Sequence, residues 1–156
     1  MSAYFTVRFP LGLVVVSYDE HGSLSRISFD LDFRTSEAPS SSDFARDLAR
    51  DLDSYLKGNP EPLDQYLDLS FASPFSRSAW KAARQIPFGS VTTYGALAAK
   101  LDRPGGARAV GQAMGSNRFP LLIPCHRVVA MGGGLGGFGS GLRLKRWLLN
   151  LEGVNL

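Results

Sequence analysis

Apolar residues in the first third of the chain gather in three short segments separated by polar turns, which is the pattern of β-strands. Residues 4–9, 11–18 and 23–29 are rich in Val, Phe and Tyr, and residues 19–22 are a turn signal. The pattern predicts a small antiparallel sheet. After a polar connector, residues 43–57 repeat apolar side chains on one helical face, which predicts a helix.

From residue 73 onward the hydrophobic pattern is that of short helices with clear ends. Ser73-Pro74 supplies a cap and a first-turn proline, and Pro87 follows the end of the same helix. A tight break at residues 102–106 separates the next two helices. The apolar segment around the single cysteine, residues 119–129, predicts a strand-like conformation. The helices predicted for this half are residues 74–86, 93–101, 107–114 and 142–152.

These patterns predict the fold class α+β, in two lobes. Residues 1–70 would form an N-terminal α/β scaffold lobe, and residues 71–156 a mostly helical C-terminal lobe. The two helices around the 102–106 break make a helix-turn-helix candidate, in which the first residues of the second helix face nucleic acid. Arg108 holds that position here. The alternative is a plain helical hairpin within the core.

Charge is distributed unevenly between the two halves. Residues 1–70 hold 6 Lys or Arg against 12 Asp or Glu, whereas residues 71–156 hold 11 against 2. A basic module of this kind suggests a polyanionic partner such as nucleic acid, because neutralised phosphates release counterions. An ordinary solvated surface of uneven composition would give the same counts.

The chain has one cysteine among 156 residues. It therefore has no internal disulfide and no thiolate cluster for a structural metal, and a reducing compartment is expected. The first residues lack the features of a signal peptide, and no stretch approaches the length of a membrane span. These observations predict a cytoplasmic protein with no membrane partner.

The cysteine, Cys125, stands directly before His126 and Arg127. A histidine can accept a proton and an arginine can favour the thiolate, so these neighbours indicate a reactive thiol rather than a buried structural one. In an extended segment adjacent side chains point to opposite faces, so we expect a water molecule to bridge Cys125 and His126. Glu152, in the last turn of its helix, is a candidate to orient the imidazole, and a solvated helix terminus is the alternative.

Residues 132–141 contain seven glycines. Residues 134–139 formally match the dinucleotide-binding pattern, but no βαβ unit surrounds them and no acidic residue follows at the required distance. We therefore expect no nucleotide cofactor. Glycines also let the backbone approach a flat ligand closely, so this loop is expected to form one wall of a pocket.

Several short motifs occur together in one order. They are Thr93-Tyr94-Gly95, Ala107-Arg108-Ala109-Val110-Gly111, Asn117, Pro124-Cys125-His126-Arg127-Val128-Val129 and the stretch from Trp147-Leu148-Leu149 to Glu152-Gly153. This set, from about Ser73 to the C-terminus, resembles the O6-alkylguanine-DNA alkyltransferases. The N-terminal lobe resembles their ribonuclease-H-like domain only in general shape.

The resemblance implies a DNA-repair protein. Such a protein binds duplex DNA carrying O6-alkylguanine, flips the damaged base into a pocket and moves the alkyl group onto Cys125, once per molecule. It implies a monomer without cofactor or metal. Activity on O4-alkylthymine and the preferred alkyl size are left open.

The resemblance also assigns roles to individual residues. Cys125 would attack as the thiolate, His126 would relay its proton through water, and Glu152 would hold the imidazole. Tyr94 would assist the departing guanine, and Asn117 would brace the turn before the active-site segment.

A second group of residues would bind DNA or the flipped base. Arg108 matches an arginine that fills the vacated base stack from the minor groove, and Ser76 and Arg103 are candidates for backbone contacts. The remaining members of this group are Met114, Arg127, Val128, Phe138 and Gly139. Phe138 stands where many relatives have tyrosine, and Gly139 replaces a serine found in some.

Three other functions fit part of the pattern. A damage-binding relative that only signals would lack the reactive Cys125. A transcription regulator would need a dimer and a sequence preference, and a cysteine hydrolase would turn over repeatedly.

Overall fold

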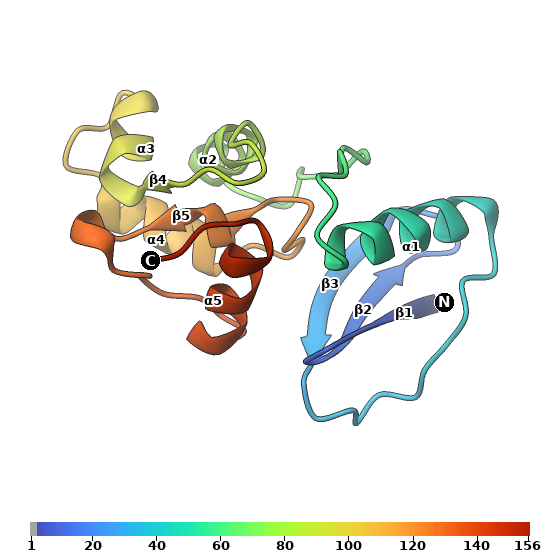
Figure 1. Ribbon diagram of the computed structural model, residues 1–156. Coiled ribbons are helices and arrows are strands. Elements are labelled where there is room, and N and C mark those ends of the chain that lie inside the picture. The colour runs from blue at the N-terminus through green and yellow to red at the C-terminus, as the bar shows by residue number, and fades with distance from the viewer. Residues whose placement is uncertain (1–2) are drawn as a thin grey trace. The chain divides into compact units, whose positions relative to one another are not determined.

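The computed structural model describes residues 3–156 and divides into two compact units, Met1–Asp68 and Leu69–Leu156. The N-terminal unit is a three-stranded antiparallel sheet in the order β1-β2-β3 with one helix alongside it (Figure 1). Its elements are β1 (Ala3–Phe9), β2 (Gly12–Tyr18), β3 (Leu24–Asp30) and α1 (Asp43–Leu56).

Alternation of buried and exposed side chains fixes the register of this sheet. Phe5 pairs with Val16, and Val14 pairs with Phe29 on the next strand. A slip of one residue would move the buried side chains to the solvent face. Helix α1 begins at its cap Ser42, whose hydroxyl accepts a hydrogen bond from the amide of Ala45 at 3.1 Å.

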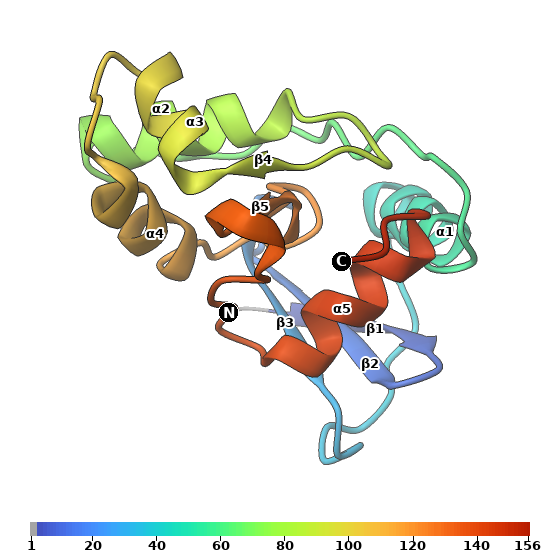
Figure 2. The same cartoon turned by 60° about the vertical axis from the view of Figure 1, so that its left-hand side comes forward.

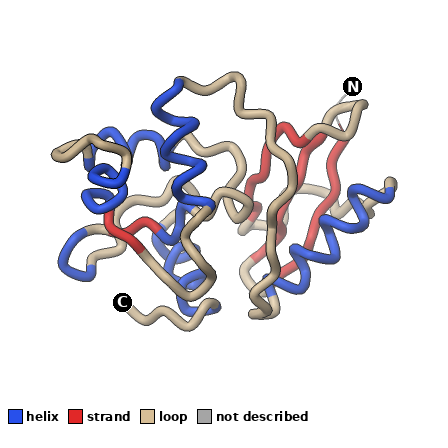
Figure 3. The backbone as a smooth tube through the Cα atoms, turned by 90° about the horizontal axis from the view of Figure 1, so that it is seen from above, coloured by secondary structure: helices blue, strands red, loops and turns tan. Residues whose placement is uncertain are grey.

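The C-terminal unit is mostly helical, with loops between short elements (Figure 3). Two two-residue strands, β4 and β5, pair in parallel, so they place the start of α3 beside the segment that carries the cysteine. The elements are α2 (Pro74–Arg84), β4 (Thr92–Thr93), α3 (Tyr94–Lys100), α4 (Ala107–Gly115), the 3₁₀ turn η1 (Cys125–Arg127), β5 (Val128–Val129), the 3₁₀ turn η2 (Met131–Gly133) and α5 (Leu142–Leu151).

Helices α2, α3 and α4 pack on one another. Ser73 and Thr93 cap α2 and α3 with their hydroxyl groups, as the sequence predicts for residue 73. The indole N–H of the buried Trp80 on α2 donates to the carbonyl of Ala113 on α4 at 2.7 Å. Helices α3 and α4 lie against each other across a tight turn (Figure 2), and Arg108 is the second residue of α4.

The prediction of a strand-like conformation throughout residues 119–129 is wrong. Cys125–Arg127 form a 3₁₀ turn, closed by a hydrogen bond from the Arg127 amide to the Pro124 carbonyl at 2.9 Å, and only Val128–Val129 form a strand. The proline disfavours a regular ladder here because it lacks an N–H group. Cys125 and His126 therefore do not lie on opposite faces of a strand.

Within residues 3–156, no helix has the length and apolar character needed to cross a membrane. In the same residues, no group of three or more His, Cys, Asp or Glu side chains is arranged to hold a metal ion.

Candidate active site

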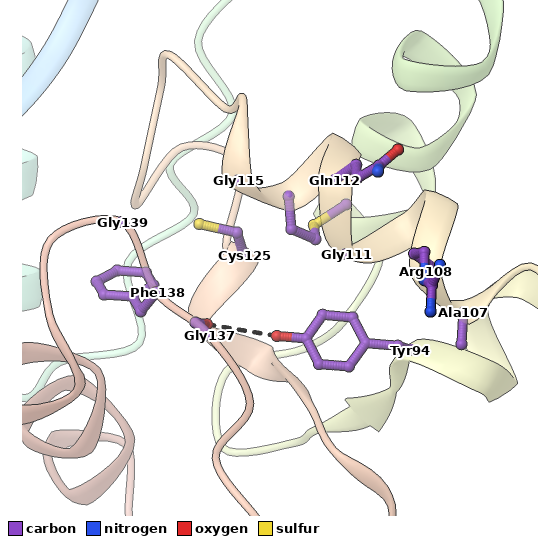
Figure 4. A pocket seen from close by; sticks show the side chains of 11 residues that line it. Tyr94, Ala107, Arg108, Gly111, Gln112, Gly115, Cys125, Gly137, Phe138 and Gly139 are labelled. Atoms are coloured by element: carbon purple, nitrogen blue, oxygen red, sulfur yellow. Dashed lines mark hydrogen bonds between the residues drawn. The ribbon is translucent and has the colours of Figure 1, made fainter.

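The 3₁₀ turn that carries Cys125 borders a cavity of about 580 Å³ within the C-terminal unit (Figure 4). This volume lies in the range of small-molecule sites. One wall is a face of α4 formed by Ala107, Arg108, Gly111, Gln112, Met114 and Gly115. The other walls are formed by Tyr94, Cys125, Gly137, Phe138 and Gly139.

The α4 wall is open because its residues are small where the helix turns toward the cavity. Ala107, Gly111 and Gly115 follow at intervals of four and share one helical face. Arg108 belongs to the same wall but is exposed, so its guanidinium group can reach beyond the cavity. Figure 4 shows Arg108 and Cys125 well separated along the cavity.

The glycine loop, residues 132–141, holds Tyr94 in place by close approach. Gly136 has φ +73°, and a Cβ atom there would lie 2.6 Å from the Tyr94 hydroxyl oxygen, so only glycine fits. The Tyr94 hydroxyl donates to the Gly137 carbonyl at 3.3 Å, as Figure 4 shows. Burial of the ring raises the pKa of Tyr94, so the phenol keeps its proton at neutral pH.

Cys125 lies at the inner end of the cavity and is only 7% exposed. Burial raises the pKa of the Cys125 thiol, and three influences oppose it: a hydrogen bond from the Asn117 side chain, the positive charge of Lys145 and nearby backbone amides. The thiol therefore needs help from its surroundings to ionise.

Asn117 braces the chain before the cysteine. Its amide nitrogen donates to the Ile123 carbonyl at 2.9 Å, and its oxygen accepts from the Phe119 amide at 2.8 Å. These two bonds bracket Leu121, a non-glycine residue with φ +76°. Such a conformation costs on the order of 1–3 kcal/mol and persists only where neighbouring bonds hold it.

The Glu152 carboxylate is a buried acceptor for three separate groups. The His126 Nε2 atom lies 2.7 Å from Oε2, and the Gly89 amide donates to Oε1 at 3.0 Å. Arg127 adds hydrogen bonds of 2.9 to 3.2 Å from Nε and Nη2. Gly153, with φ +84°, ends α5 directly after this residue. The structure thus brings His126 and Glu152 into the predicted contact.

The imidazole of His126 is 1% exposed. Burial lowers the pKa of His126, while the hydrogen bond to Glu152 acts in the opposite direction. We assign the neutral form, because Arg127 already compensates the charge of Glu152. A neutral ring that donates from Nε2 to the carboxylate leaves Nδ1 as its proton acceptor.

Arg127 differs from its predicted roles. Its guanidinium group forms the ion pair with Glu152 and donates from Nη1 to the Ile86 carbonyl at 2.7 Å. It does not line the cavity. Its charge is therefore committed to the carboxylate, rather than to the thiolate or to a bound base.

The other predicted binding residues divide into two groups. Met114, Phe138 and Gly139 line the cavity. Val128 does not, and its carbonyl accepts a hydrogen bond from Lys145 at 2.8 Å. Outside the cavity are also Ser76, in the first turn of α2, and Arg103, whose guanidinium group stacks 4.7 Å from the centre of the Phe75 ring.

Sequence reasoning missed Lys145. This residue is fully buried in α5, where the predicted apolar stripe includes its neighbours Leu144 and Leu148. At 3.6 residues per turn, Lys145 lies about 60° beyond Leu148, outside the predicted stripe, and a lysine at the edge of an apolar face is usually solvated, so the pattern gave no signal for its burial.

Residues 74–154 match the family described as 6-O-methylguanine DNA methyltransferase, DNA binding domain. A Sulfolobus acidocaldarius protein named methylated-DNA--protein-cysteine methyltransferase is 38% identical over 156 residues, which cover 100% of this chain and 96% of that protein. The chain belongs to the 6-O-methylguanine DNA methyltransferase family. The matched range contains every residue of the cavity wall.

Other members of this methyltransferase family match the chain over different shares of its length. A Salmonella typhimurium protein of the same name is 45% identical over 109 residues, which are 70% of this chain but only 64% of that protein. The Mycobacterium tuberculosis O6-methylguanine methyltransferase has a similar structure, with a TM-score of 0.80 at 34% identity over 97% of this chain and 93% of that one. A crystal structure of Mycobacterium tuberculosis OGT in complex with DNA gives a TM-score of 0.79 at 33% identity, covering 96% and 91%. These structures confirm the predicted α+β class.

Replacing the Glu152 carboxylate should destabilise the protein. Glu152→Gln leaves the largely buried Arg127 without its counter-charge, so we expect the free energy of unfolding to fall by about 3 kcal/mol. Urea unfolding followed by circular dichroism measures this change. Asp102→Asn is the matched control, because Asp102 is exposed and is the other acidic residue after residue 70. An equal loss in both variants would contradict the conclusion that Glu152 balances the charge of Arg127 in the interior.

The neutral, buried His126 should make stability depend on pH. The unfolded histidine binds a proton near its usual pKa of about 6.5, whereas the folded one resists protonation, so stability is full above about pH 6.5 and is lost as the pH falls below it. Urea unfolding at about pH 7.5 and about pH 5.5 should show this slope. His126→Gln should reduce the slope, while His21→Gln, at the other of the two histidines, should keep it.

Proposed function

We propose that this protein repairs DNA by transferring an alkyl group from O6 of guanine in duplex DNA to Cys125. The observation that carries the proposal is the position of the only cysteine, which faces a cavity and lies next in sequence to a histidine held by a buried carboxylate. A buried structural cysteine would have neither the cavity nor the neighbouring base.

The proposed step balances as a displacement at carbon. The thiolate sulfur forms a bond to the alkyl carbon, and the bond between that carbon and O6 breaks, so that guanine leaves with the electron pair. His126, through a bridging water, accepts the proton of the thiol. The departing guanine takes up one proton, so the sum of the reaction moves one alkyl group and one proton in opposite directions.

An alkyl group on O6 is inaccessible inside a base pair, so the nucleotide must rotate out of the duplex. Arg108 is suited to occupy the space that it vacates, because the side chain is exposed at the cavity wall near the start of α4. Tyr94, protonated and fixed by the glycine loop, is suited to donate a hydrogen bond to the ring of the leaving base.

The product of this step is a thioether, which has no hydrolytic route back to the thiol. The protein would therefore act once per molecule. Relatives support the assignment through their printed names, since the Salmonella typhimurium protein is a methylated-DNA--protein-cysteine methyltransferase and the Mycobacterium tuberculosis structure holds DNA. The excess of basic residues after residue 70 supports a polyanionic partner.

Two further expectations accompany the proposal. Phe138 and Gly139 stand where relatives have tyrosine and serine, so this cavity wall lacks those two hydroxyl groups. The preference for alkyl size should therefore follow the apolar character of the wall. A single thiol with no partner for an internal disulfide fits a reducing compartment, and a cytoplasmic location is part of the proposal.

Intact-mass analysis tests the transfer directly. Incubation with duplex DNA containing O6-methylguanine should add one methyl group per protein molecule and leave guanine in the DNA. Cys125→Ser should gain no mass, since no other cysteine exists in the chain. Several lesions repaired per molecule would indicate a hydrolase, and lesion binding with an unmodified thiol would indicate a damage-binding protein.

Arg108→Ala should slow methyl transfer at least about tenfold, because extrusion of the base costs a few kcal/mol that the inserted side chain offsets. Single-turnover rates on the same duplex measure the effect. Arg26→Ala is the matched control, since it removes one exposed charge from β3 of the N-terminal unit. Equal losses in the two variants would show that Arg108 contributes only its charge.

A further inference from the structure

Lys145 is a buried charged residue for which the proposed reaction has so far no use. It lies in the first half of α5 with 0% of its surface exposed. Its Nζ atom donates to the Val128 carbonyl at 2.8 Å, to the Gly137 carbonyl at 3.0 Å and to the Tyr94 hydroxyl oxygen at 3.4 Å. These three partners belong to β5, the glycine loop and α3, so one amine joins two elements of the cavity wall to the strand that follows the cysteine turn.

All of these partners are neutral oxygen atoms. In the described part of the chain, no acidic side chain lies within salt-bridge distance of Lys145, whereas Arg127 is paired with Glu152. A buried ammonium group without a carboxylate is costly unless another negative charge comes near it. The Cys125 sulfur is the group that can supply such a charge.

The other charged or titratable groups near Cys125 are two on its own turn and two on the facing elements α3 and α4. His126 is neutral, Arg127 is held by Glu152, and Arg108 is exposed on the opposite wall. Tyr94 keeps its proton. Lys145 is therefore the cation left to face a thiolate at this site.

The electrostatic influence of the two groups is mutual. Burial lowers the pKa of Lys145 to about 8, and the neighbouring thiol charge acts to raise it. In return, the positive charge of Lys145 acts to lower the pKa of the Cys125 thiol against the larger effect of burial. The lysine is consequently still protonated at neutral pH, when its charge is needed.

We propose that Lys145 is a positioning residue for the alkyl transfer, whose ammonium group balances the Cys125 thiolate and ties Tyr94 and the glycine loop to β5. This inference deepens the proposed function and rests on it for its role in repair. The claim about the thiol itself can be tested without DNA.

The rate at which iodoacetamide alkylates the thiol, measured against pH, reports the ionisation of Cys125. Modification is read by intact mass, which is unambiguous with a single cysteine. Lys145→Gln keeps a hydrogen-bond donor but removes the charge, and Lys145→Arg keeps the charge. Lys57→Gln, at an exposed lysine of the N-terminal unit, is the matched control.

We expect the midpoint of the pH profile to move upward by about one unit or more in Lys145→Gln, so that alkylation near neutral pH slows about tenfold. Lys145→Arg should keep the midpoint at or below that of the unchanged protein, and Lys57→Gln should not alter it. An unchanged profile in folded Lys145→Gln overturns the proposal. If Lys145→Gln does not fold, Lys145→Arg decides, since a raised midpoint there shows that the charge has no part.

Methyl transfer from O6-methylguanine in duplex DNA, measured on the same variants, links the thiol to repair. We expect Lys145→Gln to slow the transfer about tenfold or more with unchanged affinity for undamaged duplex, because Lys145 is buried, and we expect Lys145→Arg to restore much of the rate. A protein that shows the shifted thiol profile but accepts no methyl group would refute the proposed function and still support Lys145 as the counter-charge of the thiol.

Discussion

The carboxylate of Glu152 is the group on which the C-terminal unit depends, because it is buried and bonds to two other segments, the loop at Gly89 and the turn Cys125–Arg127. The Gly89 amide, the His126 ring and the Arg127 guanidinium group all bond to it. A buried carboxylate is tolerable only when its oxygens are fully bonded and its charge is balanced. Arg127 provides the balance, so His126 can stay neutral and remain able to accept a proton.

The cavity depends on a second constraint, which is the absence of side chains. Gly136 must be glycine because of its backbone conformation and because Tyr94 occupies the space of a Cβ atom. Gly111 places no side chain into the cavity from α4. Lys145 then ties the carbonyl of Gly137, in one cavity wall, to the carbonyl of Val128 in β5. Absent side chains thus create the space, and a buried amine fixes one of its walls.

The helices, the sheet and one wall of the cavity could be predicted from the sequence because local signals set them. Ser73 and Thr93 mark helix starts, and the glycine loop predicts a wall that backbone can approach. The 3₁₀ turn at Cys125 could not be predicted in this way, since an apolar run does not distinguish a strand from a buried turn. The role of Arg127 was missed for another reason: its partner Glu152 is 25 residues away, and only the tertiary fold decides which charge it meets.

The burial of Glu152 has a consequence for the exterior of this half of the chain. Of the two acidic residues after residue 70, one is neutralised inside and only Asp102 remains at the surface, among an excess of lysines and arginines. An excess of exposed cations with a single exposed carboxylate attracts a polyanion mainly through the release of its counterions, so the strength of such binding should fall as the salt concentration rises.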